Sequence, residues 1–401
     1  MTHAGTLVLT ILLLASAGLL LGRQRAAAVA KGDVRKLHSL PGFYGQFVFL
    51  LTAVPALLLI LAGLLAEETL PTPMPRPVLA GISLALALGC MVWALRHITP
   101  AFRARNATER FTLWLLIGAS LVAVLTTVGI VASLVGETAH FFNLYQARDF
   151  FFSLDWTPRF GGGSALGIWP LLWGTVYVSL IALLVAVPIG LMSAIYLAEY
   201  ASPRVRTWVK PAIEILAGIP TIVYGLFALI TVGPLLRDWI AQPMGFGNSS
   251  SSVMTAGLVM GIMVIPFVSS LSDDIINAVP QSLRDGSLSL GATPSETVRR
   301  VVLPAALPGI VGAILLAASR AIGETMIVVM GAGAAARLSL NPFEAMTTVT
   351  VKIVSQLTGD TEFASPETLV AFALGLTLFV ITLCLNILAL IIVRKYREQY
   401  E

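Results

Sequence analysis

An arginine and a glutamate inside an otherwise apolar stretch carry the most specific chemistry in this sequence. Arg320 lies twelve residues after Pro308, which is about 18 Å along a helix and therefore near the centre of a bilayer. An arginine there costs about 2.5–3.5 kcal/mol on insertion scales, so its side chain is expected to face protein or a watery cavity. Glu324 follows one helical turn later, on the same face, and offsets part of that charge. A guanidinium offers a planar fork to an oxyanion, and a competing carboxylate keeps such binding weak enough for release.

The same two residues also fit a structural ion pair that fixes helix packing, and a lone arginine does not identify the anion. The rest of the sequence supplies no enzyme motif. None of the lysines follows a glycine, so the Gly-Lys-Ser/Thr phosphate-binding signature is absent. The four histidines lack metal-ligand spacing, and no Gly-x-Ser-x-Gly or His-Glu-x-x-His occurs. We therefore expect no catalytic residue, metal or cofactor in this chain, and any ATP must be hydrolysed by another polypeptide.

The composition of the chain indicates that the apolar stretch around Arg320 lies in a membrane. Of 401 residues, 57% are hydrophobic and 11% are charged, whereas a soluble domain carries about 25% charged residues. Much of the surface must then face lipid, which excludes a soluble enzyme, a disordered chain and a disulfide scaffold. Stretches of roughly 20 apolar residues predict nine transmembrane helices: Gly5–Leu21, Phe43–Ala66, Val78–Leu95, Leu113–Gly136, Leu166–Leu197, Ala212–Leu236, Val253–Leu271, Pro308–Gly333 and Leu369–Val393.

The distribution of basic residues predicts the orientation of these helices. With the amino terminus outside, 18 of the 25 Lys and Arg residues fall in inner loops, six fall in outer loops, and Arg320 lies within a span. This positive-inside bias places the carboxyl terminus in the cytoplasm. The first span is expected to be a retained anchor, because its basic residues follow the apolar run instead of preceding it. Near the inner end of the sixth span, the spacing of Lys210 and Glu214 predicts an i,i+4 ion pair.

The longest inner loop, residues 272–307, predicts two short helices joined by a tight turn. The first is expected over about Gln281–Leu290. Thr293 is a favourable N-cap for the second, and Glu296 completes a capping box with it. The prolines at 304 and 308 are expected to stop this helix and redirect the chain into the eighth span. On shape alone, an ordinary loop on the membrane surface is an equal alternative.

The residues of this loop resemble the coupling loop of ABC-importer permeases, whose pattern is Glu-Ala-Ala, three residues, Gly, nine residues, Ile-x-Leu-Pro. Asp285–Ser287 occupies the first triplet, Gly291 the glycine, Val301 the isoleucine and Leu303–Pro304 the end. Every spacing matches, although the triplet keeps only the carboxylate. In that family the loop docks on the ATP-hydrolysing subunit. The resemblance assigns this role to Asp285, Gly291, Thr293, Glu296, Leu303 and Pro304.

Other stretches are similar to the phosphate-specific ABC importer permeases. They are Leu171–Leu183, Ala186–Gly190, Glu214–Ala228 and Ser319–Met330. The last looks more like the PstC type than its PstA-type partner. The resemblance covers about Thr112–Glu401. It implies an all-α polytopic membrane protein, with a type I ABC-importer permease fold of six spans in residues 111–401, preceded by a three-span extension in residues 1–110.

The resemblance also implies a function and partners. The chain would be the permease subunit of an ATP-driven inorganic phosphate importer in a bacterial inner membrane, with Arg320 and Glu324 in the substrate pathway. Its partners would be a homologous PstA-type permease, two ATP-hydrolysing subunits that hold ATP and Mg²⁺, a soluble phosphate-binding protein outside, and membrane lipid, without nucleic acid. The alternatives are a permease for phosphonate, sulfate or molybdate, an ion-coupled secondary carrier and, most weakly, a regulatory membrane sensor.

Overall fold

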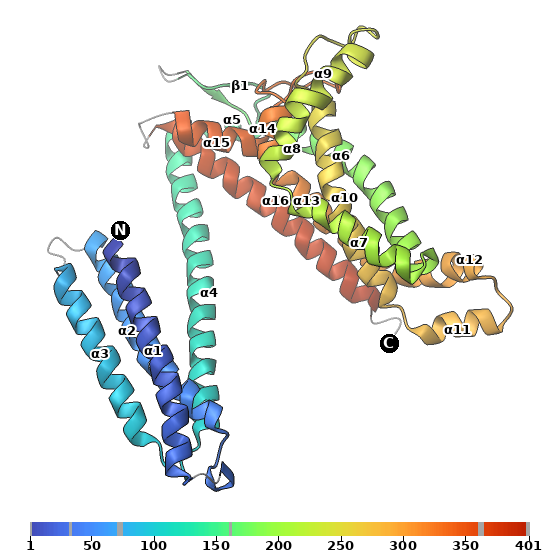
Figure 1. The fold of residues 1–401 in the computed structure, drawn as a ribbon. Helices are drawn as coiled ribbons and strands as arrows, with labels where there is room; N and C mark the ends of the chain where they lie inside the picture. The colour runs from blue at the N-terminus through green and yellow to red at the C-terminus, as the bar shows by residue number, and fades with distance from the viewer. Residues whose placement is uncertain (1, 32–33, 70–74, 160–162, 360–364, 398–401) are drawn as a thin grey trace. The chain divides into compact units, whose positions relative to one another are not determined.

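The structure is a computed structural model that describes residues 2–31, 34–69, 75–159, 163–359 and 365–397. The chain divides into two compact units, Met1–Val128 and Gly129–Glu401. The division falls inside one continuous helix, α4 (Ala104–Leu144) (Figure 1). The expected boundary after residue 110 lies earlier in the same helix and stays a prediction.

The first unit contains three long helices, a short turn and the beginning of α4. Their bounds are α1 (Thr2–Val29), a 3₁₀ turn (Val34–Lys36), α2 (Pro41–Thr69) and α3 (Arg76–His97). Two glycines lie where α1 and α2 meet. A Cβ on Gly45 would lie 2.6 Å from the Leu19 carbonyl oxygen, and a Cβ on Gly22 would lie 2.9 Å from Val48 Cγ2. Small residues at such positions let two helices approach closely in a membrane, where side-chain packing replaces the hydrophobic effect.

The second unit is helical apart from one small hairpin, β1–β2, in which Trp156 pairs with Leu166. Its elements are α5 (Ala147–Phe152), β1 (Trp156–Thr157), β2 (Ala165–Leu166), α6 (Trp169–Ile195), α7 (Pro203–Gly218), α8 (Thr221–Phe227), α9 (Gly233–Leu236), α10 (Val253–Asn277), α11 (Gln281–Ser289), α12 (Pro294–Thr297), α13 (Leu303–Ile322), α14 (Met326–Gly331), α15 (Val349–Gly359) and α16 (Pro366–Arg397). Four π-helical turns continue α6, α8, α9 and α12: Tyr196–Tyr200, Ala228–Val232, Arg237–Ala241 and Val298–Val302.

Helix α10 forms the centre of the second unit. In its most apolar window 67% of the residues are buried, against 6% for α16, so α10 packs among helices whereas the apolar stretch of α16 is largely exposed. Two glycines bring α10 against α6. A Cβ on Gly257 would lie 2.6 Å from Ile181 Cγ2, and a Cβ on Gly261 would lie 2.8 Å from Val185 Cβ.

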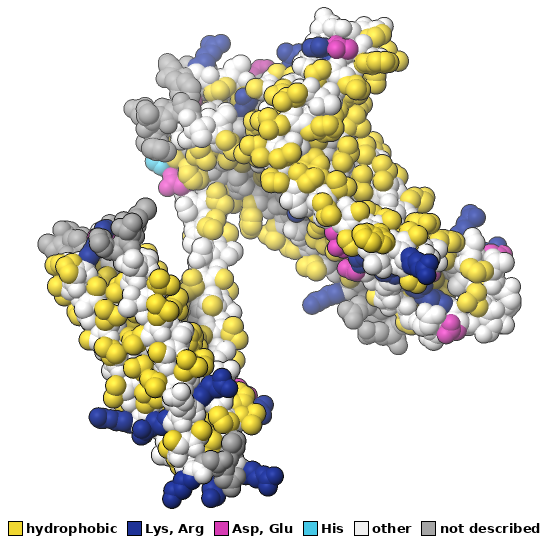
Figure 2. Space-filling model, viewed as in Figure 1, with side chains coloured by type: hydrophobic (Ala, Val, Ile, Leu, Met, Phe, Trp, Pro, Cys, Tyr) yellow, Lys and Arg dark blue, Asp and Glu magenta, His cyan; other side chains and the backbone are white. Residues whose placement is uncertain are grey.

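Nine helices in the described residues are long and apolar enough to cross a membrane, which confirms the predicted number of spans. In both units Figure 2 shows hydrophobic side chains along the helices, with most Lys and Arg near their ends. Charged side chains at the ends and apolar ones between them are the pattern expected of helices in a bilayer.

Two predicted spans are not continuous helices. The span expected over Ala212–Leu236 is interrupted at Ile219 and Pro220, between α7 and α8, because a proline supplies no amide hydrogen and favours an extended residue before it. The span expected over Pro308–Gly333 is interrupted between α13, which ends at Ile322, and α14.

Candidate functional site

The loop 272–307 forms two short helices, as predicted. Helix α11 ends at Ser289, and Gly291 takes a left-handed backbone with φ of +86°, which a glycine adopts without a Cβ penalty. Thr293 then caps α12. Its hydroxyl accepts the Glu296 backbone N–H at 3.3 Å, and the Glu296 carboxylate accepts the Thr293 N–H at 3.0 Å. Across the turn, the hydroxyls of Ser287 and Thr297 are 2.9 Å apart and hold the two helices together.

The prediction that the prolines at 304 and 308 end the loop helix is wrong. A π-helical turn, Val298–Val302, joins α12 to α13, and the helix continues through both prolines to Ile322. Pro304 lies in the first turn of α13, where a missing amide hydrogen costs little. The wider turn just before it changes the hydrogen-bond register, so the two prolines are accommodated inside one long helix.

The six residues assigned to the loop do not share one surface. Asp285, Gly291, Thr293 and Glu296 are exposed. Leu303 is half-buried and packs on the apolar cluster around Ile276. Of the exposed residues, Gly291 and Glu296 line a shallow groove between α11 and α12, which Leu290, 91% exposed, also lines. Leu303, by contrast, anchors the loop to its own unit.

Arg284 fixes α11 to the ends of two membrane helices. Its guanidinium donates to the Glu199 carboxylate, in the π-helical turn after α6, and to the Ile276 carbonyl of α10 at 2.7 Å. The side chains of Arg284 and Glu199 are only 14% and 11% exposed. A buried ion pair of this kind is costly to break, since either partner alone is left as an uncompensated charge. Helix α11 is therefore held to α6 and α10 by a specific contact.

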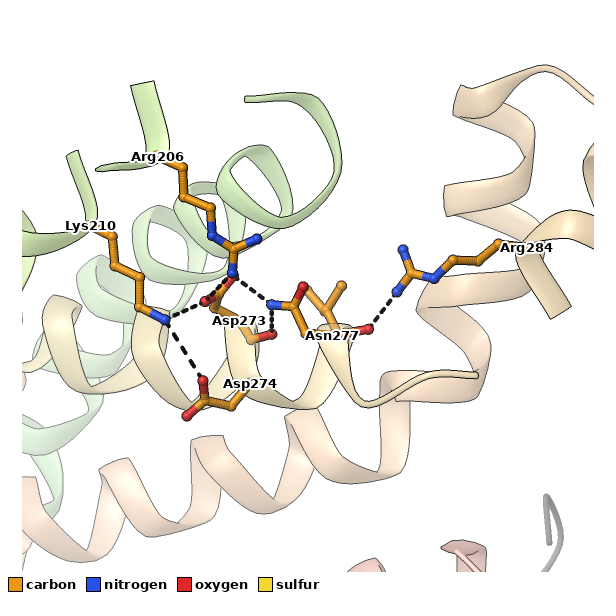
Figure 3. A network of polar contacts seen from close by, with 7 residues as sticks. Arg206, Lys210, Asp273, Asp274, Asn277 and Arg284 are labelled. Carbon is orange, nitrogen blue, oxygen red and sulfur yellow. Dashed lines mark hydrogen bonds and ion pairs between the residues drawn. The ribbon is translucent and has the colours of Figure 1, made fainter. Parts of the chain in front are cut away.

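Asp273, one turn before the end of α10, forms a second buried ion-pair centre (Figure 3). Its carboxylate accepts hydrogen bonds from Arg206 at 3.0 Å and from Lys210 at 2.7 Å, both on α7, and from the Asn277 amide at 3.0 Å. The Asp273 side chain is 2% exposed, whereas that of the neighbouring Asp274 is 68% exposed. The hydrogen bond to Asp273 raises the pKa of the Lys210 ammonium above its ordinary value.

This centre was not predicted, and it replaces the expected Lys210–Glu214 pair. Lys210 binds Asp273, which lies 63 residues further along the chain. The sequence contains one usable signal, an aspartate at the end of an apolar run, but nothing local says that Arg206 and Lys210 on another helix will reach it.

Arg320 and Glu324 are not on one helix face, because α13 ends at Ile322. Gly323 closes the helix, its N–H donating to the Ser319 carbonyl at 3.3 Å, and the backbone resumes a helix only at Met326. Within the described residues the two side chains form no ion pair with each other. Instead, the Arg320 guanidinium lies over the Phe267 ring, 5.6 Å from its centroid, and the Glu324 carboxylate accepts the Met326 N–H at 3.1 Å. The prediction of an i,i+4 pair is therefore wrong, and Arg320 is exposed.

Helix α13 connects the loop to the arginine along the chain. Leu303 begins this helix and Arg320 lies in its last turn, so 17 residues, or about 26 Å, separate them. Among the described residues no three His, Cys, Asp or Glu side chains come together as a metal group.

The capping box gives a local prediction. Thr293→Ala removes one of the two reciprocal bonds and should destabilise α12 by about 1 kcal/mol. Hydrogen exchange of the Glu296 and Thr297 amides should then quicken about fivefold. Ser295→Ala, at an exposed position of the same helix, should leave that exchange unchanged. Equal exchange in the two variants would contradict a stabilising role of the cap.

Comparison with known proteins identifies the class. The family described as binding-protein-dependent transport system inner membrane components matches residues 186–398. A second family, described as phosphate ATP-binding cassette transporter, matches residues 8–74. A crystal structure of a bacterial ABC transporter involved in the import of the acidic polysaccharide alginate matches with a TM-score of 0.50 and 14% identity, over 73% of this chain and 98% of that chain. At this identity the likeness is one of fold.

Individual relatives indicate which kind of transport permease this chain resembles. The phosphate transport system permease protein PstC of Mesorhizobium japonicum is 32% identical over 319 residues, which are 72% of this chain and 93% of the relative. PstC 1 of Mycobacterium tuberculosis is 37% identical over 252 residues, 58% of this chain and 74% of the relative. The probable ABC transporter permease YqgH of Bacillus subtilis is 31% identical and is matched over 82% of its length.

The fold is that of an ABC importer permease. The chain belongs to the family of binding-protein-dependent transport system inner membrane components, and within it to the PstC-type permeases. It is a multi-pass inner membrane protein that works with other ABC transporter subunits.

Proposed function

We propose that the chain is the permease subunit of an ATP-driven importer of inorganic phosphate and forms the translocation pathway with a second, homologous permease chain. The observation that carries this is a match over nearly the full length of a relative named as a phosphate transport permease. The geometry agrees with that role. A rigid helix–turn–helix lies at one end of the permease unit, and one long helix connects it to an exposed arginine.

The partners follow from the chemistry that this chain lacks. We infer that two separate subunits bind ATP and Mg²⁺ and dock at the groove of α11 and α12, on the cytoplasmic side. A PstA-type permease completes the pathway, and a soluble phosphate-binding protein delivers the ion from outside. The amino terminus lies outside and the carboxyl terminus inside. The chain itself holds no cofactor and catalyses no reaction.

The energy of ATP reaches the pathway through the loop. Closure of the two ATP-hydrolysing subunits moves α11, and the buried contacts of Arg284 carry that movement to the ends of α6 and α10. The helices then tilt to an outward-facing state. Phosphate passes Arg320, whose planar fork of donors matches two phosphate oxygens, and leaves inward as the loop relaxes. Glu324, which caps α14 beside this point, discourages a long residence of the anion.

The function is tested by uptake. In a bacterial strain that lacks its own PstC-type permease, this chain, expressed with its partner subunits, should restore uptake of labelled phosphate. Unlabelled phosphonate, sulfate and molybdate should compete poorly. Strong competition by one of them would assign the permease to that oxyanion instead.

Co-purification distinguishes an ATP-driven importer from an ion-coupled secondary carrier. An ATP-hydrolysing subunit should co-purify with this chain and should be lost when residues 291–304 are scrambled. Phosphate uptake without any such subunit would contradict an ATP-driven importer.

A further inference from the structure

Lys352 is a half-buried cation on α15, the helix that packs against α14 and α16 at the end of the permease unit away from α11 (Figure 1). Within the described residues its ammonium makes no hydrogen bond and no ion pair. It is the only charged residue of α15. Burial lowers the pKa of this ammonium below its ordinary value, which is the response of a cation that has lost water without gaining a counter-charge.

The described carboxylates in the C-terminal part of the second unit each have a hydrogen-bond or ion-pair partner. In residues 303–359 and 365–397, Glu324 accepts the Met326 N–H, Glu344 lies 3.7 Å from Arg337, and Glu367 accepts the Ser164 hydroxyl at 2.5 Å. A half-desolvated ammonium is costly without an anionic partner. A mobile anion that visits the site and leaves again would supply that charge.

Polar side chains surround this position on α15. Thr348 and Gln356 lie one turn before and one turn after Lys352, on the same side of the helix, and are 2% and 5% exposed. The hydroxyls of Thr348 and Thr350 are 3.0 Å apart, and Thr350 donates to the Glu324 carbonyl at 2.9 Å. Each hydroxyl proton is used in this chain of bonds, Thr348 donating to Thr350 and Thr350 to Glu324, so the Gln356 amide is the group that can donate to an oxyanion beside the cation.

The contact of Thr350 with Glu324 brings α15 to the break between α13 and α14. Arg320 lies in the last turn of α13, immediately before that break. Non-helical backbone within an apolar span is tolerated where it is buried in protein or lines a watery cavity, and broken helices mark binding sites in transporters. Arg320 and Lys352 therefore lie on the two elements that meet at one interruption of the membrane helices.

We propose that Lys352, with Gln356, forms a second oxyanion contact on the transport pathway, on the α15 side of the break that Arg320 flanks. This inference rests on the proposed function and names a residue of the pathway beyond Arg320. An ammonium is a compact point charge, whereas a guanidinium is a planar fork. The lysine is suited to receiving a tetrahedral anion in any orientation before the arginine orients it.

The test uses the complete importer in cells, with Lys352→Gln, Lys352→Arg and, as a matched control, Ser355→Gln at an exposed position of the same helix. The maximal rate of labelled phosphate uptake should fall about tenfold or more in Lys352→Gln, since a hydrogen bond to a charged group contributes about 1.5–3 kcal/mol. The half-saturating concentration should hardly change, because the external binding protein sets it. Lys352→Arg should restore most of the rate, and Ser355→Gln should match the wild type.

Three results would overturn parts of this scheme, and they are distinguishable. Wild-type uptake by Lys352→Gln would remove Lys352 from the pathway while leaving the phosphate function intact. Loss of the second permease chain from the purified Lys352→Gln complex would make Lys352 a contact between subunits instead of an anion contact. Failure of the wild-type importer to take up phosphate would reject the proposed function itself.

Discussion

Replacing Arg320 by glutamine is expected to abolish phosphate uptake while the importer still assembles. The substitution keeps a polar side chain, though a shorter one, and removes the fixed positive charge and the paired donors that bind an oxyanion. Arg320 makes no ion pair with Glu324, so no carboxylate of that break loses a partner when the charge is removed. Labelled phosphate uptake and the amount of each subunit in the membrane are the two measurements.

Two further variants define the cause of that loss. Arg320→Lys keeps the charge without the planar fork and should give an intermediate rate. Arg148→Gln, at an exposed arginine in α5, should transport at the wild-type rate. Full uptake by Arg320→Gln would exclude Arg320 from the pathway. A fall in membrane-inserted protein that parallels the lost uptake would instead assign it to packing, through its contact with Phe267.

Local chemistry allowed much of the loop to be predicted from the sequence. Thr293 and Glu296 satisfy each other's backbone groups within four residues, so their geometry depends little on the rest of the chain. The same holds for the span count, which depends on the length and polarity of each stretch. The loop prolines were misjudged because the π-helical turn before Pro304 shifts the hydrogen-bond register, and that shift is not encoded by a simple residue pattern.

Contacts between side chains on different helices could not be predicted from the sequence. Lys210 has Glu214 one turn away, yet it binds the buried carboxylate of Asp273 on another helix, at 2.7 Å. Arg320 has Glu324 at the favourable spacing, but the helix ends between them at Gly323. In both cases the periodicity of one continuous helix predicts a partner four residues away, whereas tertiary packing decides the actual contact. Lys352 is the converse case, because only the structure reveals how little of its charge is compensated.

The ion-pair centre at Asp273 leads to the second large effect, a loss of stability. Asp273→Ala leaves Arg206 and Lys210 without their shared carboxylate. Removing one partner of a buried pair costs about 3–5 kcal/mol. The two cations are 35% and 30% exposed and can turn partly toward water, so we expect a value near the lower limit, about 3 kcal/mol. Since each kcal/mol lowers Tm by roughly 2–4 °C in a unit of this size, thermal unfolding of the purified complex should shift down by about 6–12 °C.

The neighbouring aspartate provides the matched control. Asp274 carries the same charge one residue away, but its side chain is 68% exposed and lies 3.8 Å from Lys210. Exposed ion pairs contribute about 0–1 kcal/mol, so Asp274→Ala should leave Tm within about 4 °C of the wild type. Asp273→Asn keeps an acceptor oxygen for one of the donors and should fall between the two alanine variants. If Asp273→Ala and Asp274→Ala unfold at the same temperature, the buried carboxylate does not hold α7 to α10, and the stability of this end must come from apolar packing alone.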